Sequence, residues 1–385
     1  MIGAKKRIYY KLFDPKGNAI DYHWDDAKFE SFTKTINGGY GECVIELPRP
    51  FDDFGENLDV RLNNRVDIYV QDGDLEAGSE GKRIYSGYIA RYNPYIKNGK
   101  QRISITLLGH HTKLSQDIYK NGTTTTIVEA AVDIGTIMRN IMARYVAETT
   151  SPPVLIENSK IDLVSQVASY TFTALTYLEA IEITRKLAPA GWYWYVDSDN
   201  FFHFKTKPSS ITHRLYYSRH FEEIESNKNM ENIINEVLLF NGLAALDAIY
   251  KKYADASSQG QYGRRTYKST DRGFGIETTM DNYANSILDS YKNPDIELSL
   301  TLIDNSENSL GYDIESIEVG DTVKIEGFNE SIFEENMVIT EFTYLIDRMI
   351  LKIKPVKTDV FNKVYSLDKE IEKEKATEIP ADYTV

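Results

Sequence analysis

The chain has 385 residues, more than one hydrophobic core usually organises, so we expect two or more packed units. Hydrophobic residues make up 42% and charged residues 26%, which is typical of folded globular proteins rather than disordered ones. Lysine and arginine total 44 against 58 for aspartate and glutamate. The resulting formal net charge of −14 disfavours tight binding to nucleic acid phosphates.

The single cysteine, Cys43, excludes an internal disulfide. It alternates with Ile45 and Leu47, where a small buried side chain is expected. The basic N-terminus is followed by polar, tyrosine-rich sequence instead of the apolar stretch of a signal peptide, and no window approaches the roughly 18 apolar residues of a membrane helix. We therefore expect a protein made in the cytoplasm that has no membrane-spanning segment.

Residues 1–118 follow a mostly period-two pattern, which indicates half-buried β-strands. Val66, Ile68 and Val70 alternate with polar residues, and a similar run surrounds Ile105. Asn37-Gly38-Gly39 and Asn98-Gly99 are turn sequences between such runs, and the second is typical of a tight hairpin. These residues predict an all-β first domain, a small β-barrel or sandwich, and we assign it as the first β-barrel domain.

The pattern changes after Gly122. Apolar residues at three- and four-residue steps predict an amphipathic helix that follows a threonine run able to cap it. Thr176 and Glu179 have the spacing of a capping box, which predicts a second helix. The aromatic segment 191–204 reads as a hairpin around a polar turn. We assign residues 119–215 to an α+β insertion domain. The residues that predict its first helix are Val128, Ala131, Ile134, Met138, Ile141 and Tyr145.

Strand-like sequence returns in residues 216–358, which we assign to a second β-barrel domain with a helix near 280–292. The spacing of its strands from residue 319 to residue 353 resembles that from residue 64 to residue 105, although the identities mostly differ. This similarity suggests an internal duplication. Residues 359–385 form a charged C-terminal tail, in which 366–375 suggests a short helix.

Candidate catalytic and metal-binding motifs are weak. His110 and His111 would point to opposite faces of a strand, and the segment 197–200 begins like a calcium loop but lacks the later glycine and glutamate. The carboxylate pairs Asp52–Asp53 and Glu222–Glu223 are expected by chance among 58 acids. No Gly-x-Ser-x-Gly, His-Glu-x-x-His or Walker-type sequence occurs. We predict no catalytic residue, no metal site and no cofactor.

Six short segments follow one another along the chain in a distinctive order. They are 38–43 (Gly-Gly-Tyr-Gly-Glu-Cys), 83–89 (Arg-Ile-Tyr-Ser-Gly-Tyr-Ile), 191–197 (Gly-Trp-Tyr-Trp-Tyr-Val-Asp), 232–237 (Asn-Ile-Ile-Asn-Glu-Val), 262–265 (Tyr-Gly-Arg-Arg) and 317–325 (Ile-Glu-Val-Gly-Asp-Thr-Val-Lys-Ile). Their order resembles that of bacteriophage tail hub proteins, also called baseplate hub or tail-associated proteins, and the resemblance covers nearly the whole chain.

This resemblance implies an α+β, β-rich fold, with two related small β-barrels and an α+β insertion domain between them. It implies a homotrimer whose ring joins the hexameric tail tube to the threefold tip in the virion tail and gates the channel for DNA ejection. The implied partners are distal tail or tail tube ring proteins, tip, spike or fibre proteins, the tape-measure protein, and DNA in transient passage. Some relatives carry a further peptidase or lysozyme domain, for which the 359–385 tail leaves no length, so no enzymatic activity is expected.

The 27 tyrosines and 16 phenylalanines favour strands and subunit interfaces, because rigid rings bury area at low entropic cost. Two rival functions stay open: a carbohydrate-binding host-recognition protein using the aromatic hairpin as a platform, and a glycosidase or peptidase. A hexameric distal tail ring protein is a nearer rival. The predicted interface residues are Tyr69, Tyr85, Tyr88, Trp192, Trp194 and Phe342.

Overall fold

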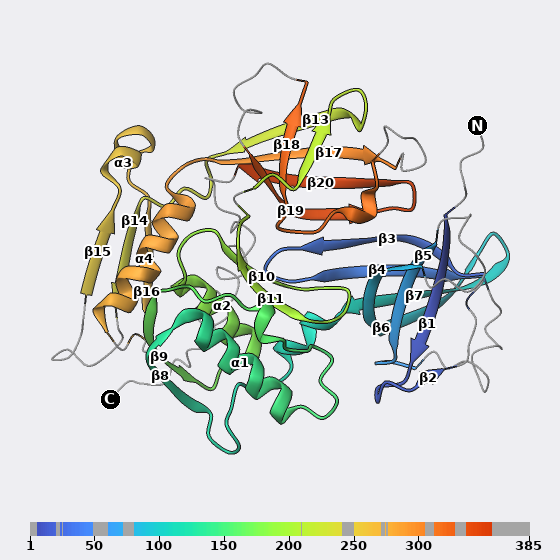
Figure 1. Ribbon diagram of the computed structural model, residues 1–385, viewed down its shortest axis with the longest axis horizontal. Helices are drawn as coiled ribbons and strands as arrows, with labels where there is room; N and C mark the ends of the chain where they lie inside the picture. The colour runs from blue at the N-terminus through green and yellow to red at the C-terminus, as the bar shows by residue number, and fades with distance from the viewer. Residues whose placement is uncertain are drawn as a thin grey trace, which may run out of the picture.

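The computed structural model divides into a β-rich part and a mixed α/β part, which lie side by side in Figure 1. One hydrophobic core fills each part. The structure describes residues 6–20, 24, 26–48, 61–71, 81–208, 210–240, 250–270, 274, 276–304, 312–327 and 336–355. The predicted tail 359–385 and the pair Asp52–Asp53 lie outside these residues.

The first β unit is built from strands of the first 109 residues. The hairpin between its last two strands turns at Asn98 and Gly99, both with positive φ (52° and 72°), as the Asn-Gly sequence predicts. A short strand β2 (Ala19–Ile20) extends the edge formed by β1. The other strands are β1 (Arg7–Phe13), β3 (Lys28–Thr35), β4 (Tyr40–Leu47), β5 (Arg65–Gln71), β6 (Lys82–Lys97) and β7 (Lys100–Gly109).

The second β unit uses strands from the last 175 residues or so. Leu298, Leu300 and Leu302 alternate inward along one strand, so the period-two prediction is confirmed there. The strands are β12 (His213–Tyr216), β13 (Phe221–Asn229), β17 (Asp295–Ile303), β18 (Thr322–Glu326), β19 (Met337–Tyr344) and β20 (Arg348–Pro355).

Both units have the same strand order. The first runs β3-β4-β7-β6-β5-β1 and the second runs β13-β17-β20-β19-β18-β12. If the two-residue strand β2 is left out and the other strands of each unit are numbered along the chain, both orders read 2-3-6-5-4-1. The units differ in that β1 pairs antiparallel with β5, whereas β12 pairs parallel with β18. A shared order in two segments far apart in sequence supports the predicted duplication.

The two units are joined into one 13-stranded sheet, because β19 pairs antiparallel with β3. Among the described residues this sheet has open ends, at β13 and at β2, and no pairing closes either unit into a barrel. The β-rich character of the fold is therefore confirmed. The orange-red strands of the second unit lie against the blue strands of the first in Figure 1.

The mixed part contains three small sheets and most of the helices, which share one core. The aromatic hairpin, the capping-box helix and the helix near 280–292 are all confirmed. That last helix packs against α2 in the mixed part rather than against the second β unit. The elements are β8 (Thr126–Asp133), α1 (Ile134–Glu148), β9 (Val167–Thr173), α2 (Tyr177–Leu187), β10 (Trp192–Val196), β11 (Phe202–Thr206), β14 (Glu236–Phe240), β15 (Tyr250–Ala254), α3 (Ala256–Tyr262), β16 (Thr266–Thr270) and α4 (Glu277–Tyr291).

The prediction that the first helix begins near Val128 after a threonine cap is wrong. Val128 lies in strand β8 with its side chain 64% exposed, and the helix begins at Ile134. The N-cap is Asp133, whose carboxylate accepts hydrogen bonds from the backbone N–H groups of Gly135 (2.8 Å) and Thr136 (3.2 Å). Strand β8 ends at Asp133 and helix α1 begins at the next residue, so the apolar residues of the two elements together have the spacing of one longer helix.

We predict that Asp133→Ala destabilises the fold by about 1 kcal/mol, because it removes the acceptor for two helix-end amides. Thr124→Ala, in the threonine run, should change stability by less than about 0.5 kcal/mol, since Thr124 is exposed and pairs only through its backbone. Urea unfolding followed by circular dichroism measures both. Equal losses in the two variants would show that the threonine run also caps the helix.

Candidate assembly surfaces

The two β units meet at a loop of the second unit that includes the short 3-10 helix η4 (Ile314–Ser316). From the first unit, Lys34 on β3 reaches this loop and is fully buried. Its Nζ lies 2.8 Å from Oε2 of Glu318 and 4.3 Å from the ring centre of Tyr40. The ring of Tyr195, on β10 of the mixed part, lies 5.5 Å away. One ammonium group therefore contacts all three regions of the chain.

The pKa of Lys34 is raised above its usual 10.5. Burial on its own lowers this pKa, but the charge of Glu318 and the hydroxyl of Tyr40 outweigh burial and favour the ammonium form. Lys34 is therefore charged inside the protein. A buried ammonium is tolerated only while its partners stay in place, so the position of the Glu318 loop is tied to β3.

A second ion pair holds the same loop. Lys6, just before β1, places its Nζ 2.5 Å from Oε1 of Glu315, and the Tyr344 hydroxyl donates to the same oxygen at 2.7 Å. Lys6 also binds Asp304, and Lys82 donates to the backbone carbonyl of Glu315. Two glutamates of one loop thus bind lysines from the first unit.

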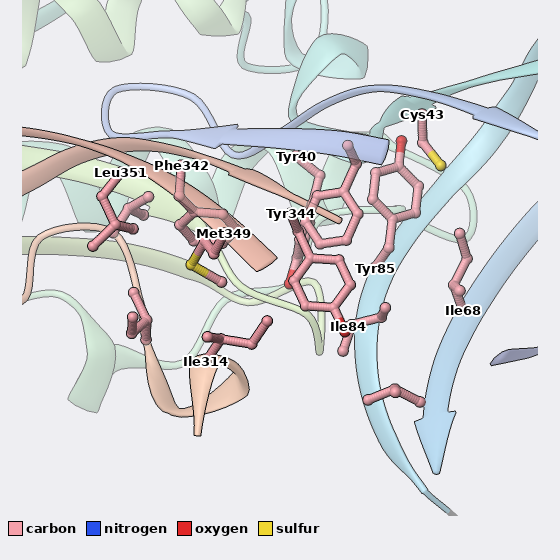
Figure 2. Packing of buried hydrophobic residues seen from close by; sticks show 14 of the residues in the cluster. Tyr40, Cys43, Ile68, Ile84, Tyr85, Ile314, Phe342, Tyr344, Met349 and Leu351 are labelled. Carbon is pink, nitrogen blue, oxygen red and sulfur yellow. The ribbon is translucent and has the colours of Figure 1, made fainter. Parts of the chain in front are cut away.

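Aromatic rings pack together where the two β units meet, as Figure 2 shows for Tyr40, Tyr85, Phe342 and Tyr344. Phe32 of β3 lies at the centre of the group. Its ring stacks on Tyr344 at 5.2 Å and contacts Tyr85 at 5.2 Å and Tyr40 at 5.5 Å. The junction is therefore packed as a protein interior and not as a loose contact between domains.

The residues predicted from sequence to form subunit contacts are all buried within the single chain. Phe342 lies at the junction just described, and Tyr69 stacks on Tyr9 at 5.0 Å. The indole Nε1 of Trp194 donates to Glu182 at 2.6 Å. Whether any of the six also contacts another subunit stays a prediction. Their exposed fractions are 9% for Tyr69, 0% for Tyr85, 7% for Tyr88, 9% for Trp192, 0% for Trp194 and 4% for Phe342.

The aromatic hairpin offers no exposed platform for a sugar ring. Every residue of β10 is buried, and its rings pack in the cores of both parts, Tyr193 and Tyr195 in one and Trp192 and Trp194 in the other. The hairpin thus fastens the mixed part to the β-rich part.

The adjacent histidines do not form a metal site. His110 and His111 lie in the 3-10 helix η2 (His110–Ser115), and among the described residues no group of three His, Cys, Asp or Glu side chains is arranged to hold a metal. His110 lines a cavity of about 520 Å³ between the first β unit and the mixed part, together with Tyr88 and Tyr145. Burial, with nearby cations such as Arg65 and Lys113, lowers the pKa of His110 to about 3, and burial lowers that of His111 to about 4.

The segment 197–200 is a turn, not a calcium loop. The Asp197 carboxylate accepts from the backbone N–H groups of Asp199 (2.8 Å) and Phe201 (2.9 Å), and it binds the ring of His203 at 2.7 Å. Its oxygens are committed to the turn and to His203. Of the other carboxylate pair, Glu223 is exposed on strand β13, and the side chain of Glu222 lies outside the description.

The described helices include none long and apolar enough to cross a membrane.

Comparison with known proteins agrees with the sequence resemblance. Residues 209–348 match the family model described as prophage endopeptidase tail. This match covers little more than a third of the chain, and it agrees with the resemblance of the sequence to phage tail hub proteins. No curated protein matches it by sequence.

Solved structures of tail proteins share the fold of this chain over almost its whole length, at low sequence identity. The 43 kDa tail protein of prophage MuSo2 from Shewanella oneidensis superposes with a TM-score of 0.61 at 11% identity, covering 92% of this chain and 99% of that one. A tail protein from Neisseria meningitidis MC58 gives 0.59 at 11%, covering 92% and 98%. Prophage tail protein gp18 from Listeria monocytogenes EGD-e gives 0.55 at 11%, covering 94% and 99%.

We predict that Glu318→Gln destabilises the protein more than Lys34→Met does. The first change leaves a buried ammonium without its anion and should cost about 2–4 kcal/mol. The second replaces the charge with an apolar chain of similar length and should cost less than about 1.5 kcal/mol, because Glu318 is 35% exposed and keeps contact with water. Urea unfolding measures both, with Lys28→Met on the same strand as the control. The reverse order would refute the account of the junction.

The histidines predict a loss of stability in mild acid. Both folded pKa values lie below the usual 6.5, so the unfolded chain binds protons first as the pH falls. The free energy of unfolding should have its full value above about pH 6.5 and decline as the pH falls toward 4. Each histidine should lower it by about 2 kcal/mol between pH 7 and pH 5. His110→Gln and His111→Gln should each flatten the curve of unfolding free energy against pH. An unchanged slope in both variants would exclude the histidines as its source.

Proposed function

We propose that the protein is a structural hub of a phage tail tip or baseplate, in which three copies form a ring. The observation that carries this proposal is the repeated strand order, because each chain presents two similar β units. Three chains then display six similar surfaces, which suits a joint between a sixfold tail tube and a threefold tip. In this proposal the two units act as small barrels once the ring is assembled.

The units also differ in a way that suits the threefold side. In the first unit a short turn joins β3 to β4, whereas in the second unit residues 230–294 lie between the equivalent strands β13 and β17. This excursion includes α3, α4 and the sheet of β14, β15 and β16, and it packs with residues 119–208 in the mixed part. It would project at three places on the ring and so reduce sixfold symmetry to threefold.

The proposed partners follow from this position: distal tail or tail tube rings on one side, tip, spike or fibre proteins on the other, and the tape-measure protein in the channel. DNA would pass transiently during ejection, and a net charge of −14 per chain favours passage without tight binding. The proposed location is the virion tail. For the domain boundaries we propose 1–118, 119–215 and 216–358, with two details added by the fold: β12 (His213–Tyr216) at the second boundary pairs with the second β unit, and the excursion 230–294 packs on the middle domain.

We propose a structural role and not catalysis. Charged groups at the junction and in the 197–200 turn bind structural partners, as the Lys34–Glu318 and Asp197–His203 contacts illustrate. A peptidase assay on peptidoglycan fragments tests this point. Turnover that one carboxylate substitution abolishes would overturn it.

The mass of the purified protein in solution tests the ring. Light scattering over a concentration series reaching tens of micromolar should give a trimer. A hexamer would instead favour a distal tail ring protein. A monomer that also fails to enter tail tips when supplied to tails assembled without it would contradict the hub assignment, and sugar binding by that monomer would favour the host-recognition alternative.

A further inference from the structure

The two β units repeat one another at the level of single hydrogen bonds. Before the fourth strand of each unit stands a residue with positive φ, Asn63 at 73° and Gly320 at 87°. In the first unit the Asn63 N–H donates to the Ile89 carbonyl at 2.8 Å, and the Ile89 N–H donates to the Asn64 carbonyl at 2.9 Å. In the second unit the Gly320 N–H donates to the Ile339 carbonyl at 2.8 Å, and the Ile339 N–H donates to the Asp321 carbonyl at 2.9 Å. The equivalent pairs are Asn63 with Gly320, Asn64 with Asp321, and Ile89 with Ile339.

The fifth strands, β6 and β19, carry a bulge at the same place. The register shifts between Ile89 and Arg91 in the first unit and between Ile339 and Glu341 in the second. Beyond the bulge, Tyr92 opposes Ile105 as Phe342 opposes Leu351, so Tyr92 is equivalent to Phe342 and Pro94 to Tyr344. A bulge bends its strand and can end its pairing with a neighbour. Beyond the bulge, β6 no longer pairs with β5 and β19 no longer pairs with β18, so that edge of each strand is available to another partner.

In the second unit this new edge is occupied by the first unit. Residues 341–344 of β19 pair antiparallel with β3, with Phe342 opposite Lys34 and Tyr344 opposite Phe32. In the first unit the equivalent stretch of β6, residues 91–97, has β7 as its one strand neighbour among the described residues. At the other end of the sheet, β13 is the equivalent of β3, and its one described strand neighbour is β17.

Side chains at the covered edge of the second unit are buried, whereas their equivalents at the uncovered edge of the first unit are exposed. Val319 and Phe342, at the junction with β3, are 2% and 4% exposed, whereas their equivalents Leu62 and Tyr92 are 56% and 41% exposed. The partner strands differ in the same way. Ile36, just after the strand β3 that pairs with β19, is 7% exposed, whereas its equivalent Met230, just after β13, is 48% exposed. Leu62, Tyr92 and Met230 are thus exposed to solvent, although the equivalent residue of the other β unit is buried in each case.

We propose that β13 of one copy of this chain pairs antiparallel with residues 91–97 of β6 in a second copy, repeating between chains the β3–β19 junction within the chain. The proposal rests on the proposed ring, and it names the strands and the register that hold the ring together. Transferring the internal register places Tyr92 opposite Lys228, Asn93 opposite Asn227 and Pro94 opposite Ser226.

The side chains brought together by this register are complementary. Because β6 is longer than β19, the ladder continues past Pro94 and places Ile96, which is 65% exposed, opposite the half-buried Ile224. Lys97 then lies opposite Glu223, and Lys228 lies beside the ring of Tyr92. Pro94 has no N–H to donate, so one bond of the ladder is missing at that position.

Such a contact is head-to-tail, because the surface on β6 differs from the surface on β13. Each copy then uses both surfaces, and a closed ring leaves neither edge exposed. Lys97 and Glu223 are charges on these edges, and charges of this kind discourage pairing with strands of other proteins while favouring the correct register.

Cysteine cross-linking tests the register directly, because Cys43 is buried and does not interfere. Asn93 and Asn227 are exposed and opposite one another in the proposed ladder. A mixture of Asn93→Cys chains with Asn227→Cys chains, at tens of micromolar with oxidised glutathione, should give a disulfide-linked dimer that contains one chain of each kind. The matched control mixes Asn93→Cys with Glu225→Cys, two residues out of register, and should cross-link at least about tenfold more slowly.

Charge reversal gives a second, independent measurement. Lys97→Glu and Glu223→Lys should each weaken self-association, and the double variant should restore at least half of the loss. The control reversal Lys100→Glu lies in the adjacent strand β7 and should change association less than Lys97→Glu.

The outcomes separate this inference from the proposed function. If the protein forms trimers but the in-register mixture cross-links no faster than the control, the strand pairing is wrong and the ring stands. If neither a trimer nor a cross-link forms and tails do not take up the protein, both fail. A selective cross-link together with rescue by the double charge reversal establishes the pairing.

Discussion

The burial of Lys34 ties together the two β units and the mixed part of this structure. Its ammonium group lies inside the protein, where an unpaired charge would be too costly to keep, and it is stabilised by Glu318 and by the faces of Tyr40 and Tyr195. These partners come from the second β unit, the first β unit and the aromatic hairpin of the mixed part. The three regions must therefore be docked before the lysine is satisfied, and the continuous sheet through β3 and β19 forms at the same place.

Many of the aromatic residues pack where the regions of the chain meet. Phe32, Tyr85 and Tyr344 pack between the two β units, and Trp194 packs in the core of the mixed part. Large rings with few rotamers fill such spaces at low entropic cost, and the tyrosine hydroxyls reach polar partners such as Glu315. The rings therefore join the units of one chain, whatever they contribute between chains.

The internal repeat connects the fold of one chain to its proposed role in a ring. The two units keep the same strand order, the same bulge and the same pair of hydrogen bonds, although few residues are identical. What differs is the environment, because one copy of the repeated surface is covered within the chain and the other is exposed at Leu62 and Tyr92. In the proposed ring this combination would let three chains match six similar neighbours.

The sequence by itself determined the local elements. Alternation around Ile68 and Leu300 gave the strands, Asn98-Gly99 gave the hairpin, and Thr176 with Glu179 gave the start of a helix, because backbone hydrogen bonding and side-chain periodicity act over a few residues. It failed at Asp133, where a strand and a helix adjoin and their apolar residues merge into one apparent period.

Only the tertiary structure decided the junction, its ion pairs and the edges left open. Lys34 and Glu318 are 284 residues apart and Lys6 and Glu315 are 309 apart, and neither pair has a motif, since any lysine and any glutamate can bind when the fold brings them together. Likewise Tyr92 and Phe342 are both aromatic residues in strand-like sequence. Phe342 is buried because β3 pairs with its strand, whereas Tyr92 is exposed, and the sequence around each residue does not reveal this difference. Contacts of this kind depend on desolvation and long-range docking, which a pattern of neighbouring residues does not encode.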